Sequence, residues 1–118
     1  MKFRSLMVAS ALIGFLSVGQ AHTHLTKSMP QDKSVLTSAP THLMLHFSEA
    51  ARLTALTLQK EGDKEARKLE PLPKEPAADF TIPVGALAAG AYSVSWRVVG
   101  DDNHIMSGAL HFTVAPSK

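Results

Sequence analysis

Apolar and polar residues alternate with a period of two over several segments of this chain, a pattern typical of half-buried β-strands. The clearest segment is 92–98, in which aromatic and branched residues alternate with serine and arginine. Beyond residue 22, no segment sustains a helical period over ten or more residues. We therefore expect an all-β fold, a Greek-key, immunoglobulin-like β-sandwich with Trp96 near the centre of its core. The alternation predicts about seven short strands, including 42–47, 56–58, 64–69, 80–82 and 110–114.

The segments between the expected strands contain residues that favour turns. Glu61, Gly62 and Asp63 suit a hairpin turn. A stretch with three prolines, at 71, 73 and 76, reads as a loop because proline removes a donor from the sheet. Residues 85–90 are rich in glycine and alanine and have room for one helical turn.

The first 21 residues have the features of a secretory signal peptide. Lys2 and Arg4 precede an apolar run at 6–18 that is too short to span a bilayer as a mature helix. Small residues at 19 and 21 then form a cleavage signal, and no stop-transfer pattern favours the alternative of a membrane anchor. We expect residues 1–21 to be removed and residues 22–118 to form one domain outside the cytoplasm.

Charge and cysteine content exclude several classes of function. Lys2 and Arg4 account for the formal net charge of +2, so the expected mature chain is neutral. It has no basic stripe with interleaved aromatic residues, so we expect no nucleic-acid partner. The chain has no cysteine, which excludes disulfides, thiolate metal sites and a cysteine nucleophile.

Histidines are the residues that could bind a metal. Cleavage after Ala21 would give His22 a free α-amine beside its imidazole, and together these form a chelate. Asp102 and His104 are two residues apart, so in an extended backbone their side chains point the same way. Amine, imidazole and carboxylate ligands suit copper(II) better than magnesium or calcium, with nickel and zinc as weaker alternatives. The spacing alone does not establish a metal site, because an Asp-x-His pair more often belongs to a solvated turn.

The mature chain resembles the CopC family of periplasmic copper-binding proteins over nearly its whole length. The resemblance is found in HTHL at residues 22–25, SMP at 28–30, LHFSE at 45–49, LAAGAY at 87–92, WRVV at 96–99, DNH at 102–104 and SG at 107–108.

The resemblance implies one copper(II) ion bound by the amine and imidazole of His22 together with Asp102 and His104. It further implies that Glu49 and His24 lie just outside these ligands. It points to a monomeric, non-enzymatic protein of copper homeostasis or resistance, and to a CopD-like copper transport protein of the inner membrane as partner.

Some members of that family also carry a methionine-rich segment that binds copper(I), and this chain has no such cluster. Met44 lies between His42 and His46 on one strand face, which would suit a soft-metal site. A partly covered sheet face is the simpler explanation, and we prefer it here.

Three other functions remain open at this point. The amine, two deprotonated backbone amides and His24 could bind copper(II) or nickel(II) without any fold. An N-terminal histidine paired with a second histidine could also belong to a copper redox enzyme, although Asp102 would fill the coordination position that oxygen needs. The third alternative is a sandwich module that binds another protein and no metal.

Overall fold

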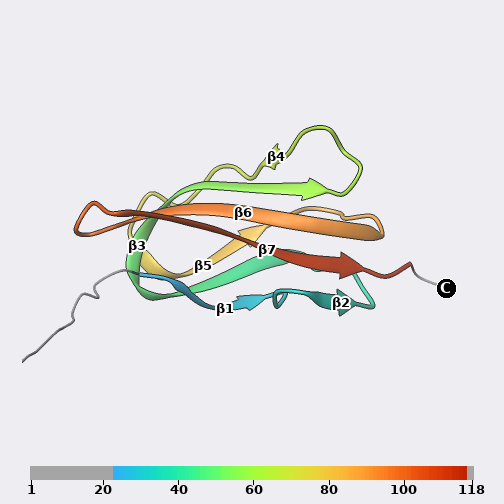
Figure 1. Cartoon of the computed structure of the whole chain (residues 1–118), viewed down its shortest axis with the longest axis horizontal. Coiled ribbons are helices and arrows are strands. Elements are labelled where there is room, and N and C mark those ends of the chain that lie inside the picture. The colour runs from blue at the N-terminus through green and yellow to red at the C-terminus, as the bar shows by residue number, and fades with distance from the viewer. Residues whose placement is uncertain (1–22, 117–118) are drawn as a thin grey trace, which may run out of the picture.

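The computed structural model describes residues 23–116, and this part of the chain contains only strands, turns and loops (Figure 1). Its seven strands are β1 (Leu25–Met29), β2 (Ser34–Leu36), β3 (His42–Lys60), β4 (Arg67–Lys68), β5 (Ala77–Pro83), β6 (Gly90–Gly100) and β7 (Ile105–Val114). Residues 23–116 contain no helix long and apolar enough to cross a membrane.

The long strand β3 takes part in both layers of the sandwich. Its first half pairs with β1 on one side and β5 on the other. Its second half pairs with β4 and β6, and β6 continues to β7, which pairs in parallel with β2. All pairs except the last are antiparallel, and the all-β sandwich expected from the alternation is confirmed (Figure 1).

β3 replaces the two separate strands expected around residues 42–47 and 56–58. Its buried residues change from odd to even numbers, from Leu53 to Leu56. The pairing with β6 shifts register between Leu53 and Ala55, which identifies a β-bulge at this point. One extra residue shifts the alternation, so that even-numbered instead of odd-numbered residues point to the core. The sequence pattern of this single strand therefore resembles that of two separate strands.

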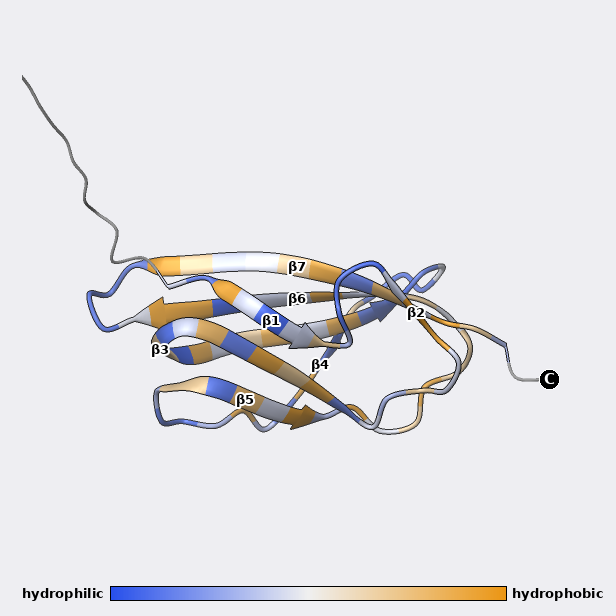
Figure 2. Cartoon of the chain, turned by 90° about the horizontal axis from the view of Figure 1, so that it is seen from below, coloured by the Kyte–Doolittle hydropathy of each residue, from blue (hydrophilic) through white to orange (hydrophobic). Residues whose placement is uncertain are grey.

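The inward residues form one apolar core between the layers. Figure 2 shows the alternation of hydrophobic and hydrophilic residues along the strands. Trp96 is 8% exposed and packs edge-to-face on Phe47, with ring centroids 5.2 Å apart, and Phe47 also meets Phe80. Aromatic rings prefer this arrangement. The central position expected for Trp96 agrees with this packing.

One connection between the strands has the conformation expected from the sequence, and two other segments differ from the expectation. Gly62 has a φ of 98°, and the Asp63 amide donates to the Lys60 carbonyl, as the expected hairpin turn requires. The polar edge strand expected at 64–69 is reduced to two residues in β4. Residues 85–89 contain no helical turn, and the Tyr92 hydroxyl donates to the Ala88 carbonyl at 2.7 Å.

Candidate metal centre

The turn between β6 and β7 presents both residues of the Asp-x-His pair. The Gly100 amide donates to the His104 carbonyl, and the Asn103 amide donates to the Gly100 carbonyl, each at 3.0 Å. Asn103 has a φ of 67°, a left-handed conformation that asparagine tolerates better than most residues. These bonds close a tight turn whose polar side chains point away from the core.

Asp102 and His104 are in direct contact. Nδ1 of His104 lies 2.7 Å from Oδ2 of Asp102, and the His104 amide donates to Oδ1 at 3.1 Å. The side chain of Asp102 is 35% exposed and that of His104 is 62% exposed. The carboxylate therefore fixes the orientation of the imidazole, and it can serve a metal either as a neighbouring ligand or as the group that orients the ligand His104.

Hydrogen bonds at Asp102 favour its charged form. The amide of His104 and then its side chain lower the pKa of the Asp102 carboxyl below its ordinary value, against a smaller opposing effect of desolvation. Asp102 is therefore ionised at neutral pH, the state in which a carboxylate binds a metal cation.

The described chain begins with residues that are fixed to the middle of β3. Thr23 is only 3% exposed, and its hydroxyl donates to the Glu49 carbonyl at 2.9 Å and accepts from the Glu49 amide at 3.2 Å. The His24 amide donates to Oγ of Ser48 at 3.0 Å, and the Ser48 amide donates to the His24 carbonyl at 2.8 Å. These bonds fix the position of the residue that follows His22.

Thr23 and the Asp-x-His turn lie at the same end of the molecule. Thr23 bonds to Glu49, and Ala51, two residues further along β3, pairs with Gly100 at the end of β6. Figures 1 and 2 both show the start of the described chain beside the turn that joins β6 to β7. His22, the first expected ligand, lies outside the described residues.

Glu49 and His24, the other expected site residues, are both exposed. Glu49 is exposed, and its hydrogen bonds to Thr23 are made by its backbone amide and carbonyl. The His24 ring is exposed, with Nδ1 3.4 Å from Oγ of Ser48. Within residues 23–116, no three His, Asp or Glu side chains gather in a group that could hold a metal. Asp102 and His104 thus form an incomplete ligand set by themselves.

Two further histidines have acidic partners that the sequence analysis missed. Nδ1 of His46 bonds to Oδ1 of Asp79, and the His111 amide donates to Oδ1 of Asp32 at 2.8 Å. These partners lie 33 and 79 residues apart along the chain. Only the pairing of strands brings them together, so no local motif could have indicated them.

Comparison with known proteins gives a consistent result. The family model described as the CopC domain matches residues 25–115. Copper resistance protein C of Escherichia coli is 30% identical, with 94% of this chain and 95% of that relative covered. Copper resistance protein C of Pseudomonas syringae pv. tomato is 31% identical, with 95% and 94% covered.

Two solved structures share the fold. CopC from Methylosinus trichosporium OB3b superposes with a TM-score of 0.69 over 82% of this chain and 97% of that one; at 24% identity, this supports the fold alone. PcoC from Escherichia coli, described as a methionine-rich copper resistance protein, is 33% identical with a TM-score of 0.59, over 80% and 99% of the two chains.

Proposed function

This chain belongs to the CopC family, and on that premise we propose that it is a periplasmic protein of copper resistance or homeostasis that binds one copper(II) ion. The proposed ligands are the α-amine and imidazole of His22 with Asp102 and His104. The observation that carries the proposal is the Asp102–His104 contact, which lies at the same end of the sandwich as Thr23.

The donor set fits copper(II) chemically. Two imidazoles, one amine and one carboxylate give the nitrogen-rich, tetragonal environment that copper(II) favours. The Asp102 carboxylate is charged, and its contact with Nδ1 of His104 holds the two proposed ligand side chains next to each other. Glu49 and His24 would lie just outside the ligands and help to position the amine.

Formation of the site depends on export in this proposal. Removal of residues 1–21 creates the α-amine, so the precursor lacks one of the four donor groups. Because Thr23 is bonded to Glu49, the new terminus would begin one residue from a fixed point of the fold. Copper(II) binding would therefore start only after the signal peptide has been cut in the periplasm.

The alternative chelate through His24 conflicts with these contacts. It needs deprotonated amides at Thr23 and His24, yet the His24 amide donates to Oγ of Ser48 and the Thr23 side chain is buried. Copper would have to break these bonds to form that chelate. The geometry therefore favours a site that uses the folded turn.

The decisive experiment is a copper(II) titration of the protein that begins at His22, followed by calorimetry and electron paramagnetic resonance. We expect the affinity to fall by at least about tenfold in His104→Ala and in a protein with one extra residue before His22. His111→Ala is a matched control because His111 is an equally exposed histidine on β7. Loss of binding in His24→Ala with full binding in His104→Ala would instead establish the chelate through His24.

We further propose that the protein binds copper rather than catalyses a reaction, acts as a monomer and passes copper to a CopD-like transport protein of the inner membrane. Asp102 would complete the ligands around copper(II) and leave no equatorial position for oxygen. Copper-dependent oxidation of a polysaccharide that disappears in His104→Ala would contradict this part of the proposal. A dissociation constant weaker than about micromolar, roughly −8 kcal/mol, would favour the metal-free interaction module.

A further inference from the structure

The outer face of the layer formed by β1, β5 and the first half of β3 carries an unusual group of side chains. Directly paired residues of neighbouring antiparallel strands point to the same face. Met29 of β1 pairs with Met44 of β3, and one position further along the sheet His46 pairs with Lys27 on one side and Asp79 on the other. Two thioethers and an imidazole therefore share one face.

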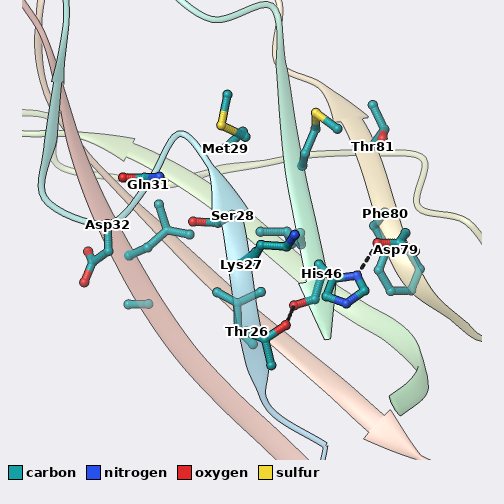
Figure 3. Close-up of a pocket in the computed structure, with 15 residues that line it drawn as sticks. Thr26, Lys27, Ser28, Met29, Gln31, Asp32, His46, Asp79, Phe80 and Thr81 are labelled. Atoms are coloured by element: carbon teal, nitrogen blue, oxygen red, sulfur yellow. Dashed lines mark hydrogen bonds and ion pairs between the residues drawn. The ribbon is translucent and has the colours of Figure 1, made fainter. Parts of the chain in front are cut away.

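This face is accessible in the described structure. Met29 is 58% and Met44 is 49% exposed, so this sheet face is partly covered, as expected, and both side chains remain accessible. Both residues line one groove with His46 and Asp79. Figure 3 shows Met29 and His46 along this groove, with Asp79 bonded to the imidazole. Met106, the third methionine in residues 23–116, packs instead against the core.

A β-bulge turns Met29 outward. Leu25 pairs with Phe47 and faces the core, so in a regular strand Lys27 and Met29 would face the core as well. The register shifts between Leu25 and Lys27, and the hydroxyl of Thr26 donates to the His46 carbonyl at 3.1 Å. The extra residue brings Met29 opposite Met44 on the outer face.

We propose that Met29 and Met44 bind one soft monovalent cation, such as copper(I), through both sulfur atoms, with an imidazole of β3 as third ligand. Thioethers select copper(I) over the harder divalent ions. Directly paired residues have Cβ atoms about 4.5–5.5 Å apart, and the flexible methionine side chain lets both sulfur atoms converge on one ion.

The third ligand is His42 or His46, which flank Met44 on the same strand face. Nδ1 of His42 lies 2.9 Å from Oγ1 of Thr41, and Nδ1 of His46 bonds to Asp79. Each histidine therefore offers Nε2 to a metal, and both rings are exposed enough to turn toward the sulfur atoms. This site uses other strands and other ligands than the copper(II) centre, so it does not depend on that proposal.

Silver(I) is the probe, because it resembles copper(I) in softness and charge but is stable in air. The exported protein, labelled with ¹³C at the methionine methyl groups, is titrated with silver nitrate in chloride-free buffer and followed by NMR. We expect the methyl signals of Met29 and Met44 to shift together at one equivalent, while that of Met106 stays in place. Equal shifts of all three signals, or none at Met29 and Met44, would overturn the proposal.

Variants separate this site from the copper(II) centre. Met29→Leu and Met44→Leu keep the shape and exposure of the side chains, and each should weaken silver binding by about tenfold or more. Met106→Leu is the matched control and should leave it unchanged. His104→Ala should impair only copper(II) binding.

A double variant tests the imidazole. His42→Ala combined with His46→Ala should weaken silver binding by about tenfold, since one of the two rings is a ligand. Undiminished affinity in this variant would refute the third ligand. The amide NMR spectrum of each variant shows whether the sandwich has stayed folded.

Discussion

Gly108 of β7 lies against the indole ring of Trp96, its partner on β6. A methyl group at Gly108 would stand 2.5 Å from Cζ2 of Trp96, well inside contact distance. The ring is also in contact with Phe47, which limits its room to move. Close approach between the two strands therefore requires a residue without a side chain at this position.

Gly108→Ala should destabilise the protein by about 1–3 kcal/mol, because overpacking forces a buried aromatic ring out of its position. Urea unfolding followed by Trp96 fluorescence measures the effect. Ser107→Ala is the control, since Ser107 is exposed and its loss should change the free energy of unfolding by less than about 0.5 kcal/mol. Equal stability of both variants would show that the ring moves freely.

Thr23→Val should lower both stability and copper(II) affinity. Valine keeps the shape of threonine but loses the hydroxyl that donates to the Glu49 carbonyl and accepts from its amide. A buried polar group that loses its hydrogen-bond partner lowers the free energy of unfolding by about 1–3 kcal/mol. Thr23→Ser retains the hydroxyl and should restore most of the copper affinity in a titration. If Thr23→Val bound copper as well as the unchanged protein, the Glu49 contact would not position the N-terminus.

The hydrogen bonds at Asp102 should make stability depend on pH in the acid range. The pKa of Asp102 is lowered in the folded state, chiefly by the His104 amide. Its stabilising contribution is therefore fully present above the ordinary aspartate pKa and is lost as the pH falls through the lower, folded-state pKa. Unfolding free energies measured between neutral and strongly acidic pH should show a weaker acid dependence in Asp102→Asn than in Asp101→Asn, which removes a carboxylate from the same turn.

Mild acid should release copper(II). The amine and the imidazoles must lose their protons to bind, so protons compete with the metal. Calorimetric titrations at neutral pH and near pH 5 should show a clear loss of affinity. Silver(I) binding at Met29 and Met44 provides an internal comparison, because thioethers do not take up protons in this range and only the imidazole would respond. An unchanged copper(II) affinity would argue against imidazole and amine ligands.

The fold was predictable where the period of two is regular. In β6, each inward residue expected from the sequence is buried, from Tyr92 to Val98, because both sides of this strand pair with neighbours in the same layer. β1 and β2 were not identified, since edge strands of five and three residues are too short to show a clear alternation. The continuity of β3 was missed because its bulge changes the phase of the pattern.

The candidate site was predictable only in its local part. The spacing of Asp102 and His104 indicated that their side chains could meet, and they do. Their place at the same end as Thr23 depends on the pairing of β3 with both β1 and β6, which no local pattern reports. The same limit applies to Met29 and Met44, whose pairing requires the bulge at Thr26 as well as the correct register.

Because β3 pairs with strands of both layers, it couples the two layers of the sandwich. Separation of β1 and β5 from β3 would expose Phe47 and Phe80 and thereby remove the support of Trp96 in the opposite layer. We therefore expect the two layers of the described sandwich to unfold together. A disturbance at the outer face of one layer is thus expected to be felt as a change in the global unfolding equilibrium, rather than as local fraying.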